Sequence, residues 1–203
     1  MSELSRGELE RHGSKGQLST GPKLARWVLV GIAGAIVVFA ILVAQASPNS
    51  PNAVAPSRLV GALAPPIVGS TISGSTFALA HDKNDYVLVN FFASWCVPCR
   101  TETAAFKRFL SLSSGQPWGA RIKLVGVTVN DRKRSVDAFA SGLGITWPVV
   151  FDQSGEVALA YGVQNPPQTF LVAPNGKVIT RIVGGVTTGG LMALVNLAYS
   201  TYR

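Results

Sequence analysis

The sequence predicts an α/β domain with a mixed central sheet flanked by helices, preceded by one apolar N-terminal helix. From residue 86 onward, apolar strand-like runs alternate with helical patterns in the order β, α, β, α, β, α, β, β, α. Helical crossovers make consecutive strands parallel, whereas the Asn175-Gly176 turn makes the last two strands antiparallel. Residues 27–46 carry no charge, which predicts a separate apolar helix.

The composition is that of a folded protein with a basic surface. Of its 203 residues, 47% are apolar and 14% are charged, so the chain can build a packed core. The formal net charge is +8, but the basic residues are scattered and the densest run is only Arg132-Lys133-Arg134. No zinc-finger or RNA-binding signature accompanies them. We therefore expect a solvated basic surface and no nucleic-acid partner.

The N-terminal region predicts a membrane anchor. Residues 1–26 are polar and form the predicted cytoplasmic tail, and the predicted transmembrane segment follows at residues 27–46. Twenty helical residues span about 30 Å, the thickness of the hydrocarbon core of a bilayer. A buried core helix is the alternative, but such helices seldom lack a polar face over this length.

The flanking charges predict the orientation of this segment. Lys23 and Arg26 lie just before it, whereas the first basic residue after it is Arg58. The positive-inside rule then places the N-terminus in the cytoplasm and the C-terminal domain outside the cell membrane. Cleavage after Ala46, in the A-x-A pattern 44–46, is an alternative. We favour an uncleaved anchor because the apolar stretch exceeds the usual signal-peptide core.

The exported part begins with a linker. Residues 47–58 contain three prolines and few apolar residues, which predicts an extended tether before a domain at residues 59–203. The first stretch of this domain, to about residue 80, predicts an N-terminal hairpin extension. The continuous apolar run Tyr86–Ala93 predicts a buried central strand. The later predicted elements are a helix at 98–112, a strand at 122–129, a helix at 132–143, a short strand at 148–151, a short helix at 155–161, strands at 169–172 and 178–183, and a helix at 191–202.

Two cysteines, Cys96 and Cys99, follow the predicted central strand directly. Cys96 lies at the start of a helix, where the helix dipole and unpaired backbone N–H groups favour the thiolate. Cys99 lies one turn further on, within reach of a mixed disulfide on Cys96. Pro98 suits a first helical turn because it needs no N–H partner. The pair therefore indicates dithiol–disulfide exchange.

The alternatives for these cysteines are weaker. A structural zinc site needs four ligands, and the only histidines are His12, on the other side of the predicted membrane, and His81. Covalent haem attachment would need a histidine where Arg100 stands. Two inert buried thiols remain an alternative. We expect no metal and no cofactor beyond the redox-active cysteine pair.

A proline pair directly precedes the strand predicted at 169–172. A cis-proline at the edge of a peptide-binding site is a known device, and Pro167 is the candidate. From these residues alone, an ordinary trans Pro-Pro loop is the alternative.

Residues 89–100, VNFFASWCVPCR, closely resemble the active-site stretch of the TlpA-like thioredoxins. This family includes the ResA and CcmG (DsbE) proteins of cytochrome c maturation. The resemblance runs from about residue 59 to the C-terminus and also includes Trp147–Asp152 and the YGV…P-x-T-F block at 161–170. It implies a thioredoxin fold, and a single N-terminal anchor is usual in the group.

The resemblance also implies roles for individual residues within and around the Trp95–Cys99 motif. Cys96 would attack the substrate disulfide, Cys99 would resolve the mixed disulfide, and Pro167 would be a cis-proline facing the pair. Glu102 would be a carboxylate that tunes the cysteines; a surface position is its alternative. Asn90 stands where thioredoxin has a buried acid, so that proton relay is expected to be absent.

Two departures from the family pattern concern the proline loop. Asn165-Pro166 replaces the usual Gly-Val, and Pro166 lacks an N–H that would bond a docked substrate backbone. Gln168 stands where the cytochrome-maturation branch often carries an acid, which makes that specific role less secure than the redox chemistry.

The leading hypothesis is a reductant of disulfides in exported proteins, with the Cys-x-x-Cys-His site of apocytochrome c as substrate. It requires a thiol-type electron donor in the membrane. A general extracytoplasmic oxidase or isomerase is the alternative, because the motif does not fix the reduction potential. A tethered thioredoxin-like binding module is a further alternative. Peroxidase chemistry is a weak one, since no Thr-x-x-Cys pattern precedes Cys96.

Overall fold

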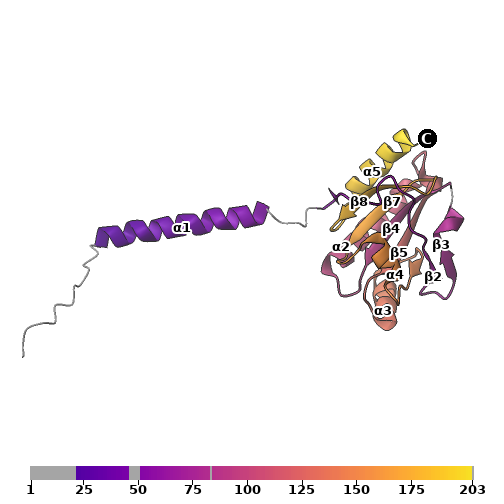
Figure 1. The fold of residues 1–203 in the computed structure, drawn as a ribbon, viewed down its shortest axis with the longest axis horizontal. Coiled ribbons are helices and arrows are strands. Elements are labelled where there is room, and N and C mark those ends of the chain that lie inside the picture. Colours follow the sequence, from indigo (N-terminus) through magenta and orange to yellow (C-terminus); the bar gives the residue numbers. More distant parts are fainter. Residues whose placement is uncertain (1–21, 46–50, 83, 203) are drawn as a thin grey trace, which may run out of the picture. The chain divides into compact units, whose positions relative to one another are not determined.

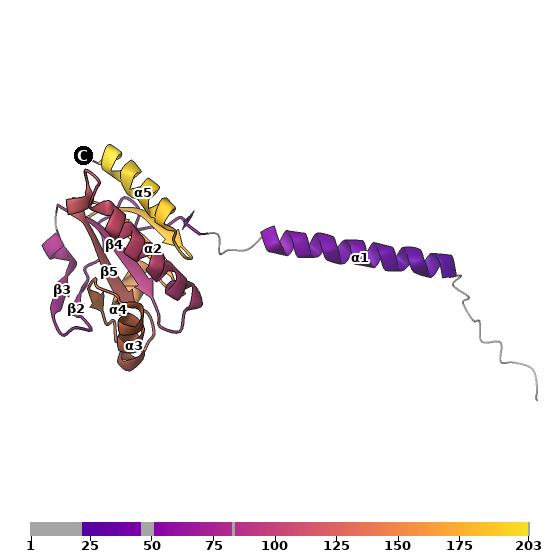
Figure 2. The same cartoon turned by 180° about the vertical axis from the view of Figure 1, so that it is seen from behind.

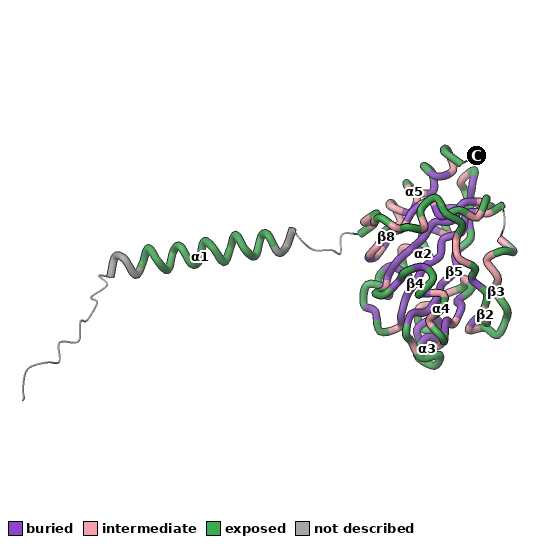
Figure 3. The backbone as a smooth tube through the Cα atoms, viewed as in Figure 1, coloured by how far each residue is buried: buried purple, intermediate pink, exposed green. Residues whose placement is uncertain are grey.

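The structure, a computed structural model, describes residues 22–45, 51–82 and 84–202, which belong to two separate units. The first unit contains helix α1, Pro22–Gln45. Its side chains are described for residues 26–42 and are exposed throughout (Figure 3). Among the side chains described, no helix is both long enough and apolar enough to cross a membrane. The predicted tail up to residue 21 and the cleavage position at Ala46 lie outside the described residues.

The second unit is built on a six-stranded mixed sheet in the order β1-β8-β7-β4-β5-β6 (Figure 1). Strands β4, β5 and β6 run parallel, β7 runs antiparallel to β4, and β8 runs antiparallel to both β7 and β1. This arrangement confirms the predicted mixed α/β sheet. The strands are β1 Ala53–Val54, β4 Tyr86–Phe92, β5 Ile122–Thr128, β6 Val149–Val150, β7 Gln168–Val172 and β8 Val178–Val183.

Strand β4 lies at the centre of the sheet, and all seven of its residues are buried. Its side chains alternate between the two faces because successive residues of a strand point in opposite directions. Val89 and Phe91 belong to the core on one face, and Leu88 belongs to the core on the other. Helices therefore have to cover both faces of the sheet.

Helices α2 and α5 cover one face, and α3 packs over the end of that face near Phe92 (Figures 1 and 2). Helix α4 and the segment before β4 cover the other face. The rings of Phe92 and Phe139 stack at 5.5 Å, which fixes α3 against the central strand. The helices are α2 Val97–Ser113, α3 Lys133–Leu143, α4 Glu156–Tyr161 and α5 Thr188–Thr201, with short 3-10 helices at Leu79–Asp82 and Gly119–Arg121.

The predicted N-terminal hairpin is confirmed as a separate two-stranded sheet. Strands β2, Val68–Ser70, and β3, Thr76–Ala78, pair antiparallel. The hairpin contacts the edge of the main sheet, where the Ile72 N–H donates to the Val149 carbonyl at 2.9 Å.

The segment expected to be a free linker, residues 47–58, differs from that expectation in its described part. Ala53 and Val54 form β1, which pairs with β8 at the edge of the sheet. Asn52 bonds to the start of α5, where its Oδ1 accepts the Thr187 N–H at 2.9 Å. Prolines indicate an extended backbone, and this backbone also fits an edge strand, which is why composition alone suggested a tether.

Candidate active site

The two cysteines lie at the junction between β4 and α2. Cys96 is the N-cap residue of α2 in extended conformation, and its Sγ accepts the Cys99 backbone N–H at 3.2 Å. This N–H is one of the donors that have no partner within a helix. A disulfide joins Cys96 to Cys99, and Pro98 occupies the first helical turn. The predicted position of the two cysteines at the N-terminus of a helix is therefore confirmed.

The surface around the pair is apolar and accessible next to Cys96. Cys96 itself is 5% exposed and Cys99 only 1%. Trp95 and Val97 on either side of Cys96 are 58% and 76% exposed. Cys96 is therefore the less buried of the two cysteines, and the residues on either side of it are open to solvent.

The loop after β5 holds this motif in place, and the sequence analysis did not identify it. The Trp95 indole N–H donates to the Asn130 carbonyl at 3.2 Å. The Asp131 carboxylate accepts the backbone N–H of Ser94 at 2.5 Å and its hydroxyl at 3.0 Å. A signal was available, because Asn130 and Asp131 come just after β5, a buried parallel strand. The carboxyl ends of such strands gather at one edge of the sheet, where sites form.

Glu102 is buried below the cysteine pair, so the surface position considered for it is wrong. Its side chain is 2% exposed, and it lies one helical turn after Cys99 on the same face of α2. Its Oε1 accepts a hydrogen bond from Asn90 Nδ2 at 2.9 Å. The same amide nitrogen donates to Thr169 Oγ1 at 3.2 Å. The structure therefore joins Asn90 and Glu102 in one buried network, and Thr169 is a member that the sequence analysis missed.

Burial raises the pKa of Glu102 to about 8, because the apolar surroundings disfavour its charged form. Hydrogen bonding from Asn90 and the nearby backbone of Val186 oppose this shift without cancelling it. Glu102 Oε2 is buried and has no hydrogen-bond partner among the described residues. The carboxyl group therefore holds a proton at neutral pH that it can exchange with a nearby group.

The proline loop precedes β7, and the peptide bond between Pro166 and Pro167 is cis. Gln168 pairs with Phe91 in the sheet, so Pro167 lies level with the end of β4 from which Cys96 follows. Gln168 is buried and donates through Nε2 to the Asn165 carbonyl at 3.0 Å, and its Oε1 accepts from Arg181 at 3.0 Å. Gln168 thus links the loop to β8.

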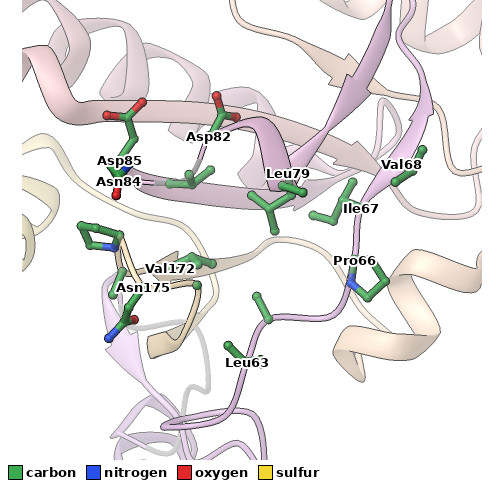
Figure 4. Close-up of a pocket in the computed structure, with 16 residues that line it drawn as sticks. Leu63, Pro66, Ile67, Val68, Leu79, Asp82, Asn84, Asp85, Val172 and Asn175 are labelled. Atoms are coloured by element: carbon green, nitrogen blue, oxygen red, sulfur yellow. The ribbon is translucent and has the colours of Figure 1, made fainter.

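A cavity of about 590 Å³ lies at the other end of the sheet (Figure 4). Ile67 and Leu79 belong to its largely apolar lining, and it includes Val87 and Val172 at the start of β4 and the end of β7. Cys96 follows the opposite end of β4, and seven strand residues span about 20 Å. The cavity is therefore separate from the disulfide chemistry.

Within the described residues, no three His, Cys, Asp or Glu side chains come together to hold a metal ion. Of the two histidines, His12 lies outside the described residues, and His81 belongs to the 3-10 helix Leu79–Asp82.

Comparisons with known proteins agree with this site. The AhpC/TSA family model matches residues 60–181. The chain is 34% identical over 128 residues to the thiol-disulfide oxidoreductase ResA of Geobacillus thermodenitrificans, covering 63% of this chain and 71% of that protein. It is 31% identical over 140 residues to the thiol:disulfide interchange protein DsbE homologue of Paracoccus denitrificans, covering 67% of this chain and 72% of that protein.

A solved structure of a thioredoxin-family thiol:disulfide interchange protein from Chlorobium tepidum superposes with a TM-score of 0.60 and 27% identity. The match covers 71% of this chain and 99% of that structure. It confirms the thioredoxin fold predicted from the motif around Cys96. The chain therefore belongs to the AhpC/TSA family of thioredoxin-like proteins and is a thiol-disulfide oxidoreductase of the ResA and DsbE type.

Proposed function

We propose that this oxidoreductase is a membrane-anchored reductant of disulfides in exported proteins and that its substrate is the Cys-x-x-Cys-His site of apocytochrome c. One observation carries the redox part of the proposal: Cys96 Sγ sits at the N-terminus of α2 and accepts the Cys99 N–H at 3.2 Å. A helix N-terminus with a donor aimed at sulfur stabilises the thiolate form. The apocytochrome substrate rests on the resemblance of residues 89–100 to the cytochrome-maturation thioredoxins.

The proposed reaction begins with the reduced protein. The Cys96 thiolate attacks one sulfur of the substrate disulfide, the substrate S–S bond breaks, and the released substrate thiolate takes a proton from water. Cys99, once deprotonated, attacks Cys96 Sγ and releases the second substrate thiol. Two electrons pass to the substrate, and the protein is left with the Cys96–Cys99 disulfide, which is the state in this structure. A membrane thiol donor returns it to the reduced form.

We propose that Glu102 accepts the proton that Cys99 loses before it attacks Cys96. Both residues lie on the buried face of α2 one turn apart, where water has little access. A carboxyl whose pKa is about 8 is mostly protonated at neutral pH but keeps an ionised minority, and this ionised form can accept the proton of the thiol and return it later. Asn90 and Thr169 are positioning residues in this proposal, because Asn90 donates a hydrogen bond to the Glu102 carboxyl and Thr169 accepts one from the same Asn90 amide.

A disulfide-bonded Cys-x-x-Cys-His peptide tests the exchange step. Reduced full-length protein in a neutral detergent should reduce this peptide. Cys99→Ser should accumulate a mixed disulfide through Cys96, and Cys96→Ser should form none. A tethered binding module instead predicts that Cys96→Ser retains full function in cells. The identity of the substrate is tested by measuring the level of c-type cytochromes in a strain that lacks this protein. Normal levels would exclude the apocytochrome assignment.

The direction of exchange depends on the reduction potential of the Cys96–Cys99 pair. A reductant requires a potential well below about −180 mV, the range of protein disulfide isomerase. Equilibration of the full-length protein with glutathione or dithiothreitol measures this value. A potential above that range would favour the general oxidase or isomerase that the sequence leaves open.

The proposed anchor is the segment 27–46, with the tail 1–26 in the cytoplasm and the oxidoreductase domain outside. It is supported by the absence of charge over these twenty residues and by a helical backbone from residue 22 to 45. The described side chains within it are exposed and apolar, as lipid contact requires. The test is carbonate extraction of cell membranes followed by protease treatment of spheroplasts. Release into the soluble fraction, or protection of the domain from external protease, would contradict the proposal.

A further inference from the structure

Three exposed basic residues lie on the two elements that border the active-site motif, α2 and the start of α3, and have no role in the exchange chemistry. They are Arg100, Arg132 and Arg134, and together they are called the basic rim. Arg100 follows Cys99 on α2, and its guanidinium carbon lies 5.2 Å above the centre of the Phe139 ring. All three side chains are exposed. The rim is therefore open to solvent and to a binding partner.

Hydrogen bonds connect the rim to the active-site motif. Asp131 accepts the N–H of Arg132 at 2.7 Å and, through its other oxygen, the N–H of Ser94 at 2.5 Å. Asn130, one residue earlier, accepts the indole N–H of Trp95, the residue directly before Cys96. The start of α3, with Arg132 as its N-cap residue, is thus held against the loop that carries Cys96.

The nearby carboxylates do not neutralise the rim. Asp131 is half-buried and accepts three hydrogen bonds, from the backbone and hydroxyl of Ser94 and the backbone of Arg132, and its single negative charge leaves the three arginines with a net positive charge. Glu102 is buried, and Asp137 forms its ion pair with Lys133 at 2.9 Å. In the part of the chain that the structure describes, none of the three rim arginines forms a salt bridge. Their charges remain available to a partner.

Helix stability does not explain the rim either. Arg132 is the N-cap residue of α3 and makes no side-chain capping bond, and Arg134 lies in the first turn. The N-terminus of a helix is the positive end of its dipole and favours acidic residues, so basic residues there are unfavourable. Residues that oppose the stability of their own helix and border a reactive site are best explained by binding.

We propose that the basic rim recognises acidic polypeptide and that the disulfide partner of this protein carries Asp or Glu residues next to its cysteines. This inference rests on the proposed exchange function and names the class of its substrate or donor. Exposed Trp95 and Val97 contact the apolar part of the partner near its disulfide, and the rim pairs with the flanking carboxylates. Opposite charges across such a surface raise the association rate and exclude wrong partners.

The test uses two synthetic peptides that contain the same intramolecular disulfide, one flanked by Asp and Glu and the other by Lys and Arg. Reduced full-length protein in neutral detergent should reduce the acidic peptide roughly ten times faster at an ionic strength of about 20 mM. At about 0.5 M the ratio should fall below about two, because salt screens exposed charges. A ratio near one at low salt would overturn the proposal.

Variants of the rim and a matched control complete the test. The double substitution Arg132→Glu/Arg134→Glu should abolish or invert the preference, and Arg132→Gln/Arg134→Gln should reduce it. Glutamate is favoured by the helix dipole at this position and glutamine removes an unfavourable positive charge, so both variants should fold. Lys177→Glu makes the same kind of charge reversal at the far turn after β7, where Lys177 is exposed, and should keep the preference. A preference that survives in both rim variants would refute the rim's role.

Two further outcomes distinguish this inference from a failure of the proposed function and from binding to an anionic membrane. If neither peptide is reduced, while dithiothreitol reduces both, the proposed function itself fails. If both peptides react equally and the rim variants instead lose binding to phosphatidylglycerol vesicles, the rim serves an anionic membrane surface and the acidic-partner proposal is wrong.

Discussion

Replacing Glu102 with glutamine should change the pH dependence of stability. Unfolding exposes the carboxyl to water, where it ionises near its ordinary value of 4.5, whereas in the folded protein its pKa is about 8. Between these two values the folded protein binds one proton more than the unfolded chain. The free energy of unfolding therefore falls as the pH rises from about 4.5 to about 8 and is level outside that window.

The size of this effect follows from the same two values. At 1.36 kcal/mol for each tenfold change in proton affinity, the difference is worth at most about 5 kcal/mol. Relaxation of the site when Glu102 ionises reduces it, so we expect a loss of about 2–4 kcal/mol in the wild type. Glutamine keeps the shape and an oxygen for Asn90 but never ionises. The variant should match the wild type at pH 5 and exceed it by that amount above pH 8.

Urea unfolding of the oxidised full-length protein, followed by tryptophan fluorescence at several pH values between 5 and 9, measures this difference. Glu156→Gln is the control, because Glu156 is exposed at the start of α4 and its replacement should leave the pH dependence as in the wild type. Parallel pH profiles for the Glu102→Gln variant and the wild type would refute the assignment of a buried, neutral carboxyl to this position.

The substitution Asp131→Ala should lower the free energy of unfolding by about 1–2 kcal/mol, since it leaves the partly buried donors of Ser94 without an acceptor. It should also slow exchange with a disulfide peptide, and unchanged rates would contradict a role of Asp131 in holding the active-site motif. Phe139→Ala removes a buried ring that stacks at 5.5 Å on β4 and should cost about 3–5 kcal/mol in urea unfolding. A cost below about 1 kcal/mol would show that α3 does not depend on it. Thr187→Ala removes the hydroxyl that accepts the Gly190 N–H at the start of α5 and should lower stability by about 1 kcal/mol, whereas no change would mean that water replaces the cap.

Local sequence patterns predicted the secondary structure and the strand directions of the fold well. The apolar run at β4 and the amphipathic pattern of α3 are strong signals, and Val136, Phe139 and Ala140 form the buried face of α3 as expected. The Asn-Gly turn at residues 175–176 likewise predicted the antiparallel pair of β7 and β8. These features depend on residues close together in the chain, so a short stretch of sequence is enough to predict them.

Interactions between distant residues could not be predicted in the same way. Asp131 clasps Ser94 across 37 positions, and Asn90 reaches Thr169 across 79. No local pattern states which polar side chain a fold will bring together. Glu102 illustrates the point, because its polar neighbours in sequence suggested a surface residue, whereas the position of α2 against the sheet buries it.

The short strands at the two edges of the sheet reduce the risk that copies of the protein aggregate through these edges. β1 and β6 have only two residues each, and beyond β6 the N–H of Ile72 and the N–H of Phe151 already pair the hairpin with the edge. Long unpaired edges let copies of a protein add strands to one another and aggregate. Copies of this protein that meet at high concentration therefore have little edge backbone to pair with.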